Sequence, residues 1–204
     1  MGLIICLEGM IGSGKTTQAE LLHAAISHSY LLPELNQHSP LKETIQSWKK
    51  RRPTFTYTKE DILELADAYA QTQKKLLLLV PPNAMIITDR NVYTPIVYQA
   101  DAMPMDEIAQ IHKKAGVLFP EFGMVLDCAP ATALARVDER RKQAGVYATR
   151  SWQENLMEFE RRKARYVTLV NATPSLKVIC SESCKENVFE KVKNTLRRQY
   201  HDIF

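Results

Sequence analysis

The sequence lacks the features that would direct a chain into a membrane or an oxidising compartment. Its longest candidate for a membrane-spanning apolar run, Leu76–Val80, is far too short for a span and is closed by Pro81 and Pro82. The N-terminus enters a predicted strand at once, so we expect no signal peptide. None of the 4 cysteines has a Cys-x-x-Cys spacing, which favours reduced thiols in a cytoplasmic protein. The 5 histidines are scattered, so we expect no metal cluster.

Strong charge of either sign is also lacking. The chain has 27 Lys and Arg residues against 23 Asp and Glu, a net charge of +4. So mild a charge suits an anionic small molecule and gives no reason to expect a nucleic-acid polymer as partner. The basic run at residues 49–53 could bind nucleic acid or a phosphate, but we interpret it as a solvated helix end. A chain of 204 residues with 45% apolar content predicts one domain spanning residues 1–204.

What the sequence does contain, close to its start, is the stretch Gly9–Thr16. It reads Gly-Met-Ile-Gly-Ser-Gly-Lys-Thr and fits G-x-x-x-x-G-K-[ST], the pattern of a phosphate-binding P-loop. A predicted buried strand at residues 3–7 precedes it and a predicted helix at residues 16–26 follows. Its glycines let backbone N–H groups point at an anion, and the helix directs its positive dipole end to the same place.

This loop predicts a site for ATP and Mg²⁺. We expect Lys15 to be exposed in the loop and to reach the β- and γ-phosphates, and the Thr16 hydroxyl to serve Mg²⁺. A glycine-rich turn that fits the pattern by chance is the alternative, and the flanking strand and helix argue against it. The residues that we expect to bind the nucleotide here are Gly9, Gly12, Ser13, Gly14, Lys15, Thr16 and Thr17.

Strands and helices alternate along the rest of the chain. We predict strands at residues 29–32, 85–88, 124–126 and 176–180, and helices at 41–50, 58–80, 94–100, 105–114, 130–142, 152–171 and 185–204. Thr58 caps the long helix, with Asp61 in a capping-box position, and Ser151 caps the helix at 152. A polar turn is expected at residues 35–40. This order predicts an α/β protein with the three-layer P-loop nucleoside triphosphate hydrolase fold: a parallel five-stranded sheet with helices on both faces.

Polar residues at the predicted strand ends mark the ligand site, because ligands of such sheets lie beyond the carboxyl ends of the strands. Glu34, Asp89, Arg90 and Asp127 hold such positions. A buried carboxylate at Asp89 is costly without a partner, and a nearby Mg²⁺ would supply one. Arg90 would clamp a phosphate with two hydrogen bonds and neutralise charge in the transition state. A purely structural Asp–Arg pair is the alternative interpretation.

Arginines gather around the small, polar stretch at residues 143–149. They are Arg136, Arg140, Arg141 and Arg150. Such a loop between two helices is what a lid over ATP needs, because closure excludes water and brings cations to the transferring phosphoryl group. We therefore predict a short Arg-rich lid at residues 140–152, with Arg140 and Arg141 on the nucleotide and Arg150 as the catalytic arginine. A solvated basic surface is the alternative.

Several segments together resemble the thymidylate kinase family. They are Glu8-Gly9, Lys15-Thr16-Thr17-Gln18, Thr88-Asp89-Arg90, Val97-Tyr98-Gln99, Leu126-Asp127 with Pro130, Leu134-Ala135-Arg136 and residues 159–166. The resemblance spans nearly the whole chain. It implies a homodimeric kinase that passes the γ-phosphoryl group of ATP, with Mg²⁺, to a deoxynucleoside monophosphate, with dTMP as the family default.

The resemblance also assigns residues to the acceptor. It implies that Asp89 serves the metal, that Arg90 holds the acceptor phosphate, and that Tyr98 packs against the sugar. Family members carry their catalytic arginine either in the P-loop or in the lid, and with no arginine in its P-loop this chain resembles the lid type. The residues that we expect to contact the acceptor are Glu34, Gln71, Arg90, Thr94, Tyr98 and Gln99.

Four positions depart from the family pattern: Ile11, Ala68, Asn91 and Pro95. Ile11 stands where the family usually has a carboxylate that meets the acceptor sugar. The family's base-contacting arginine falls on Ala68, or on Gln71 or Gln73 if the alignment carries a gap. The residues for phosphoryl transfer therefore match the family and those for reading thymine do not, so we expect weak or altered selectivity for thymine.

Two other functions stay open from the sequence. The P-loop also resembles that of deoxynucleoside kinases, in which a glutamate that Glu34 could match deprotonates a 5′-hydroxyl. Those kinases usually carry Glu-Arg where this chain has Asp89-Arg90, and a surface turn residue is an equally good interpretation of Glu34. A nucleotide-dependent switch without kinase activity is the third possibility, but the sequence has no Asn-Lys-x-Asp motif of the kind that a GTPase would need.

Overall fold

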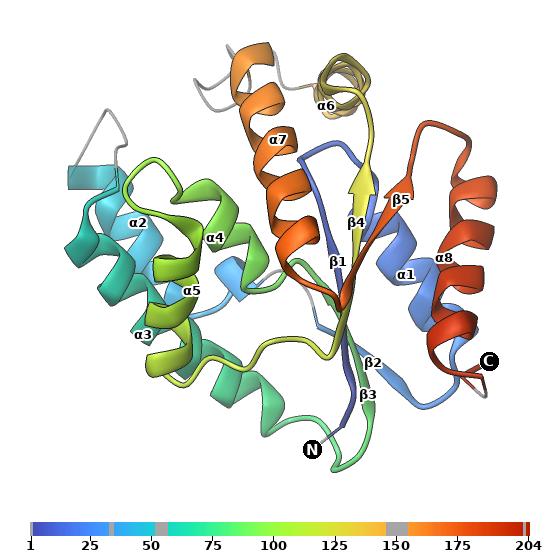
Figure 1. Cartoon of the computed structure of the whole chain (residues 1–204), viewed down its shortest axis with the longest axis horizontal. Coiled ribbons are helices and arrows are strands. Elements are labelled where there is room, and N and C mark those ends of the chain that lie inside the picture. The colour runs from blue at the N-terminus through green and yellow to red at the C-terminus, as the bar shows by residue number, and fades with distance from the viewer. Residues whose placement is uncertain (1, 33–34, 52–56, 146–154, 202) are drawn as a thin grey trace. The chain divides into compact units, whose positions relative to one another are not determined.

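The computed structural model describes residues 2–32, 35–51, 57–145, 155–201 and 203–204 (Figure 1). The strands are β1 (Ile4–Glu8), β2 (Ser29–Leu32), β3 (Met85–Asp89), β4 (Phe122–Asp127) and β5 (Leu176–Cys180). The helices are α1 (Lys15–Ala25), the 3-10 helix η1 (Leu35–Gln37), α2 (Leu41–Arg51), α3 (Lys59–Leu77), α4 (Tyr93–Tyr98), α5 (Met105–Lys114), α6 (Pro130–Gln143), α7 (Leu156–Ala172) and α8 (Lys185–Gln199). The strands form a 5-stranded sheet in the order β2-β3-β1-β4-β5, which confirms the predicted α/β fold.

The chain divides into two compact units, each built from separate stretches of sequence. The first unit consists of Met1–Cys6 and His28–Glu121, and the second of Leu7–Ser27 and Phe122–Phe204. The division falls inside β1, which contributes its first residues to one unit and Leu7 and Glu8 to the other. The P-loop therefore belongs to the second unit, and the Asp89-Arg90 pair to the first.

In the first unit, β2 and β3 pair in parallel. The predicted long helix, α3, begins at the capping residue that its sequence predicts, Thr58. The Thr58 hydroxyl accepts a hydrogen bond from the Asp61 N–H at 3.2 Å, and the Thr58 N–H donates to the Asp61 carboxylate at 2.8 Å. This reciprocal pair is a capping box, as predicted. The apolar stripe expected on α3 is buried: Ile62, Leu65, Ala66 and Tyr69.

In the second unit, β4 and β5 pair in parallel and carry helices on both sides. Figure 1 shows α7 on one side of this strand pair, and α1 and α8 on the other. The Gln18 amide joins α1 to α8 by donating to the Lys185 carbonyl at 3.0 Å. An apolar cluster packs the P-loop against α6 and α7, and its buried members are Met10, Cys128, Ala133, Leu134, Val137 and Phe159.

Three local predictions were wrong. The helix expected from residue 152 begins at Leu156, because Asn155 caps it by accepting the Glu158 N–H at 2.9 Å; the predicted cap, Ser151, lies outside the described residues. The last helix ends at Gln199 and does not run to the end of the chain. The expected polar turn at 35–40 contains η1, because the apolar side chain of Leu35 is buried. No helix in the described part of the chain is long and apolar enough to cross a membrane.

His112 is a buried titratable side chain of the first unit. It lies on α5, where its Nδ1 donates to the Ile108 carbonyl at 2.9 Å and its ring packs edge-to-face against Tyr69, with centroids 6.0 Å apart. Burial lowers the pKa of His112 below its ordinary value of 6.5. The folded protein therefore holds this imidazole neutral.

Acidification should destabilise the wild-type protein more than the His112→Phe variant. Because the folded pKa lies below the unfolded one, the unfolded chain takes up a proton first as the pH falls, so stability is lost below about pH 6.5. Urea unfolding of both proteins at about pH 7.5 and about pH 5.5 measures this difference. His23→Gln, at an exposed position on α1, is the matched control and should keep the wild-type slope. Equal losses in the wild-type and His112→Phe proteins would contradict a neutral buried His112.

Candidate active site

The P-loop connects β1 to α1 in the second unit, and close packing demands glycine at two of its positions. A Cβ at Gly9 would collide with the Leu126 carbonyl, and one at Gly12 would collide with the Ala133 carbonyl of α6. Both glycines also have positive φ angles, 133° and 82°. Gly14 caps α1 in the left-handed conformation. Backbone folded this tightly at a helix N-terminus has the shape of an anion-binding loop.

Lys15 is buried, whereas the sequence led us to expect it exposed. Its side chain is only 5% exposed, and its Nζ donates to the Met10 carbonyl at 2.6 Å and to the Ser13 hydroxyl at 3.5 Å. A buried ammonium group needs such partners, and oxygens of the P-loop itself supply them. The positive charge therefore lies inside the loop that the motif predicts to bind phosphates. Thr16 and Thr17 follow it as exposed residues in the first turn of α1.

Helix α6 contacts the P-loop through Arg136. One guanidinium nitrogen donates to the Gly12 carbonyl at 3.4 Å and another to the Ser181 carbonyl at 2.9 Å. We expected Arg136 beside the lid with the other arginines, and the structure brings it to the backbone of the P-loop. Arg140 is exposed and Arg141 is partly buried, both in the last turn of α6. The predicted catalytic residue Arg150 and most of the predicted lid lie outside the described residues.

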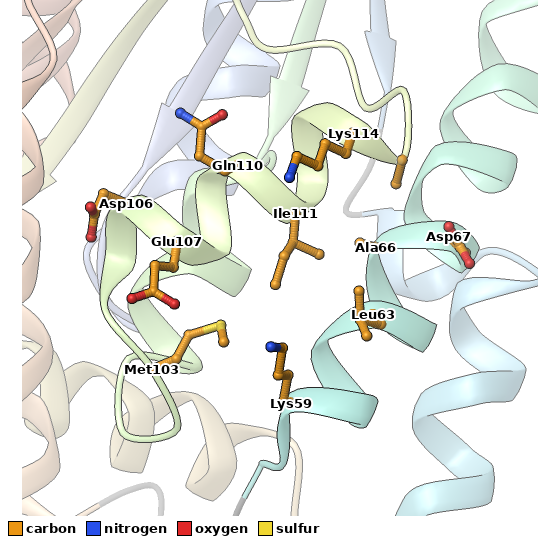
Figure 2. A pocket seen from close by; sticks show the side chains of 11 residues that line it. Lys59, Leu63, Ala66, Asp67, Met103, Asp106, Glu107, Gln110, Ile111 and Lys114 are labelled. Carbon is orange, nitrogen blue, oxygen red and sulfur yellow. The ribbon is translucent and has the colours of Figure 1, made fainter.

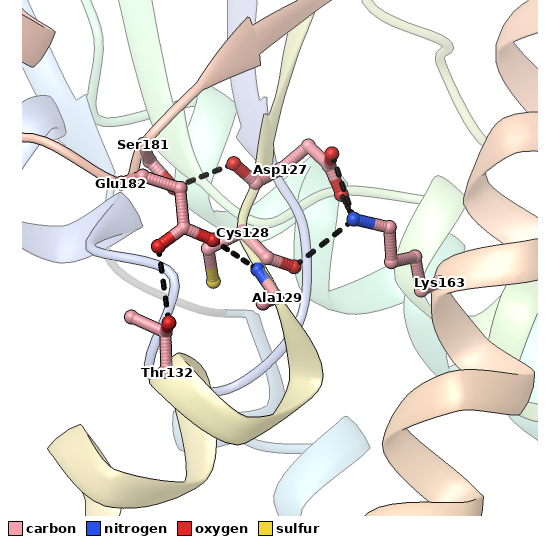
Figure 3. Close-up of polar contacts among 7 residues, drawn as sticks. All are labelled: Asp127, Cys128, Ala129, Thr132, Lys163, Ser181 and Glu182. Carbon is pink, nitrogen blue, oxygen red and sulfur yellow. Dashed lines mark hydrogen bonds and ion pairs between the residues drawn. The ribbon is translucent and has the colours of Figure 1, made fainter.

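A polar network joins the carboxyl ends of β4 and β5 (Figure 3). The Asp127 carboxylate pairs with the Lys163 ammonium of α7 at 3.0 Å, and Lys163 also donates to the Cys128 carbonyl at 3.3 Å. From the other side, the Ser181 N–H and hydroxyl donate to the Asp127 carbonyl at 2.7 and 3.1 Å. The strand-end residue Asp127 is thus part of a network that joins α7, β4 and the residues after β5.

Glu182 continues this network, and sequence reasoning missed it. Its carboxylate accepts hydrogen bonds from the Ala129 N–H and, at 3.0 Å, from the Thr132 hydroxyl (Figure 3). The hydrogen bond from the Ala129 backbone, helped by that from Thr132, lowers the pKa of the Glu182 carboxyl. Burial raises the pKa of the neighbouring Cys128 thiol, so this cysteine stays protonated and unreactive at neutral pH.

Glu8, the last residue of β1, places a fully buried carboxylate directly before the P-loop. Its Oε2 accepts a hydrogen bond from the Tyr166 hydroxyl at 3.1 Å. Tyr166 lies on α7, on the same face as Lys163 one turn earlier. The helix that follows the predicted lid is therefore bonded to the entrance of the P-loop as well as to the end of β4.

In the first unit, three of the predicted acceptor residues come together after β3. Arg90 donates to the Thr94 hydroxyl at 3.1 Å, and its guanidinium carbon lies 5.8 Å from the centroid of the Tyr98 ring. Arg90 also has a φ of 67°, an uncommon conformation for a residue with a side chain. Strain of this kind is concentrated at functional sites, where surrounding contacts hold it. Arg90, Thr94 and Tyr98 thus place a guanidinium group, a hydroxyl group and an aromatic ring next to one another.

Asn91 is one of the four departures from the family pattern, which often has an aromatic residue at this position. Its Oδ1 accepts the Val92 N–H at 2.7 Å and its Nδ2 donates to the Thr88 hydroxyl at 3.2 Å. The Tyr69 hydroxyl lies 3.5 Å from the same Oδ1. The buried Asn91 side chain thus fixes the end of β3 next to Arg90, which an aromatic residue could not do with hydrogen bonds.

The glutamines considered for the base contact lie in different surroundings. The Gln73 amide donates to the Leu118 carbonyl at 2.8 Å and accepts the Leu118 N–H at 2.7 Å. Both polar atoms of this side chain are therefore bonded to the protein backbone, which argues against Gln73 as the residue that contacts the base. Gln71 is exposed on α3. Gln99 is 1% exposed, and its Oε1 accepts no hydrogen bond from the residues that the structure describes. Gln99 therefore has an acceptor atom to offer.

A pocket of about 520 Å³ lies between α3 and α5 in the first unit (Figure 2). Leu63, Met103 and Ile111 line the pocket with apolar side chains, and Lys59 and Lys114 line it with side chains that end in ammonium groups. None of the predicted site residues within the described ranges lines this pocket. It is separate from the candidate active site.

The predicted metal ligands, Thr16 and Asp89, lie in the second and the first unit respectively. Across the described ranges, no group of 3 or more His, Cys, Asp or Glu side chains could hold a metal ion. One carboxylate and one hydroxyl are nevertheless typical of Mg²⁺ sites in which substrate phosphates and waters complete the coordination. The donor chemistry of these two residues therefore fits Mg²⁺. The predicted acceptor residue Glu34 lies outside the described residues.

Comparison with known proteins gives one consistent family. The family model described as Thymidylate kinase matches residues 7–192. The chain is 29% identical over 180 residues to the thymidylate kinase of Thermomicrobium roseum, covering 85% of this chain and 84% of the relative. It is 27% identical over 213 residues to that of Symbiobacterium thermophilum, covering 98% and 97%.

Two solved structures share the fold. The thymidylate kinase of Candida albicans has a TM-score of 0.68 at 17% identity, covering 97% of this chain and 92% of that one. That of Ehrlichia chaffeensis has a TM-score of 0.68 at 19% identity, covering 96% and 98%. At such low identity these two likenesses concern the fold.

Proposed function

The chain belongs to the thymidylate kinase family, and we propose that it catalyses the ATP-dependent phosphorylation of dTMP to dTDP. The observation that carries this proposal is the match of the family model across residues 7–192, which include both the P-loop and the Arg90 cluster. In the reaction, an oxygen of the dTMP phosphate attacks the γ-phosphorus of ATP, the bond from that phosphorus to the bridging oxygen breaks, and ADP leaves. Transfer of label from γ-labelled ATP into dTDP tests the proposal.

The donor side of the reaction rests on the P-loop. We assign phosphate binding to the backbone N–H groups around Gly9, Gly12, Ser13 and Gly14. Thr17, in the first turn of α1, is assigned to the same nucleotide site. Lys15 lies within this loop, where its ammonium would exchange the Met10 carbonyl for phosphate oxygens and stabilise the charge that builds up on transfer. Mg²⁺, which we assign to Thr16 and Asp89, would neutralise the phosphate charge when bound.

The acceptor side rests on the cluster after β3. Arg90 would hold the dTMP phosphate, and its contact with Thr94 orients the guanidinium group. Tyr98 presents the ring that would pack against the deoxyribose. The buried amide of Gln99 would meet the base, with the exposed Gln71 and with Glu34 as further acceptor contacts. A phosphate acceptor is already an anionic nucleophile, so no residue has to deprotonate it.

The remaining assignments come from the family resemblance and from the composition of the sequence. We propose that residues 1–204 act as one kinase domain with a lid at residues 140–152, that the protein is a homodimer in the cytoplasm, and that neither a membrane nor a nucleic-acid polymer is its partner. Arg140 and Arg141 would bind the nucleotide from the end of α6. The deoxynucleoside kinase and the switch without kinase activity are not favoured by the family match.

Arg150→Ala should lower kcat while the KM for dTMP stays nearly unchanged. We assign Arg150 to the closed lid, so its contact with the phosphoryl group forms chiefly in the transition state. Loss of one such donor costs about 10² to 10³ in rate. Steady-state kinetics with varied dTMP measures the effect, and Arg198→Ala, an exposed arginine on α8, is the control. An unchanged kcat would transfer this role to Arg140 or Arg141.

A further inference from the structure

The first turn of α6 receives its cap from a residue far along the chain. Its N-cap position is Ala129, whose side chain has no hydrogen-bonding atom, and no side chain caps the helix in the usual way. Glu182, 53 residues away in sequence, accepts the Ala129 N–H with one carboxylate oxygen and the Thr132 hydroxyl with the other. A carboxylate at this end of a helix also interacts favourably with the helix dipole. Glu182 therefore anchors α6 to the residues that follow β5 (Figure 3).

The same helix is bonded to the P-loop one turn later. Arg136 donates to the Gly12 carbonyl at 3.4 Å, and also to the carbonyl of Ser181, the residue next to Glu182, at 2.9 Å. The backbone of α6 approaches the P-loop so closely at Ala133 that only glycine fits at position 12. The helix, the P-loop and residues 181–182 thus form a closed set of contacts within the second unit.

We propose that Glu182 is a positioning residue for ATP: by capping α6 it holds Arg136 and Ala133 against Gly12 and so keeps the P-loop in its phosphate-binding shape. The proposal rests on the proposed function only in naming ATP as the ligand of the P-loop. Glu182 itself is exposed and needs no contact with the nucleotide. Glu182 acts on the P-loop by holding α6 in place, and the last turn of this helix also carries Arg140 and Arg141.

The direction of the change in ATP affinity distinguishes this proposal from a direct electrostatic effect of the Glu182 charge. Glu182 is negatively charged and ATP is an anion, so removal of the charge alone would strengthen ATP binding or leave it unchanged. If Glu182 holds the P-loop in shape, its removal lowers the fraction of molecules that can bind, and the apparent Kd rises in inverse proportion to that fraction. Loss of a helix cap typically shifts the local equilibrium by about tenfold, and this shift sets the upper limit of the increase in Kd.

The experiment measures binding of a fluorescent ATP analogue with Mg²⁺ to the purified full chain, without dTMP, for Glu182→Ala, Glu182→Gln and Glu186→Ala. We expect the Kd to rise severalfold, up to about tenfold, for Glu182→Ala and less for Glu182→Gln, which keeps an oxygen to accept the Ala129 N–H. Glu186→Ala removes an equally exposed acidic charge at the start of α8 and should leave the Kd unchanged. In dTMP turnover, the KM for ATP should rise in Glu182→Ala while the KM for dTMP changes by less than about twofold.

Two results would overturn the proposal. One is a folded Glu182→Ala protein that binds the ATP analogue with wild-type affinity or more tightly. The other is a Glu186→Ala protein that loses as much affinity as Glu182→Ala, which would make the effect one of general charge. If Glu182→Ala fails to fold, Glu182→Gln decides, with wild-type affinity again counting against the proposal. Because binding is measured without an acceptor, the outcome does not depend on dTMP being phosphorylated, so failure of the proposed function is recognised separately.

Discussion

Lys15→Met should abolish phosphoryl transfer to dTMP while the protein stays folded. The Lys15 ammonium is buried within the P-loop and bonded to the Met10 carbonyl at 2.6 Å, so it holds a positive charge where the phosphates would lie. Methionine keeps most of the side-chain volume and removes the charge, so packing survives and stabilisation of the transferring phosphoryl group does not. We expect kcat to fall by about 10³ or more.

The matched control for this variant is Lys191→Met. Lys191 is another lysine that donates to a backbone carbonyl, that of Cys180 at 3.2 Å, and it lies on α8 outside the P-loop. Its replacement should leave turnover unchanged within about twofold, because an exposed hydrogen bond contributes little to stability or shape. Near-UV circular dichroism confirms the fold of both variants. Wild-type turnover by a folded Lys15→Met protein would remove the P-loop from the mechanism.

Arg90→Ala should raise the KM for dTMP and lower kcat together. Arg90 is held over the Tyr98 ring and on the Thr94 hydroxyl, in a backbone conformation that few residues adopt. We assign the doubly charged acceptor phosphate to this guanidinium group, which would bind it in the ground state and keep it aligned during transfer. We expect kcat/KM to fall by about 10³, the loss of a well-placed charged contact in both states.

Glu34→Gln is the companion variant that separates the two acceptor classes. If the acceptor is a monophosphate, Glu34 has no proton to remove, and kcat should stay within a few-fold of wild type. If the acceptor were a nucleoside, the same variant should lose about 10² or more in kcat, the usual contribution of a general base. A large loss in Glu34→Gln combined with a small one in Arg90→Ala would contradict the assignment of dTMP.

Local sequence patterns predicted the elements of this fold well. The capping box at Thr58 and the apolar stripe on α3 follow from residues three or four apart, and both are present in the structure. The start of α7 was placed wrongly because Ser151 and Asn155 are both good caps, and a local pattern cannot rank two competing caps. The positions of α5 and β5 were predicted to the residue.

The contacts that shape the site could not be predicted in this way. Arg136 reaches the Gly12 carbonyl 124 residues away, and Glu182 caps α6 across 53 residues. Neither pair belongs to a spacing that periodicity can detect, because both arise from how helices pack on the sheet. Lys15 was expected to be exposed because the motif indicates its ligand but not the oxygens that surround its ammonium in the folded loop.

An acceptor competition shows whether the chain phosphorylates dTMP. The protein is incubated with γ-labelled ATP, Mg²⁺ and an equimolar mixture of the natural deoxynucleoside monophosphates and thymidine, and the labelled products are separated and identified. We predict labelled dTDP as a main product, with other labelled diphosphates alongside it to the extent that the lack of the family's base-contacting arginine at Ala68 relaxes selectivity. Label found in dTMP formed from thymidine, or no acceptor-dependent label, would contradict this activity.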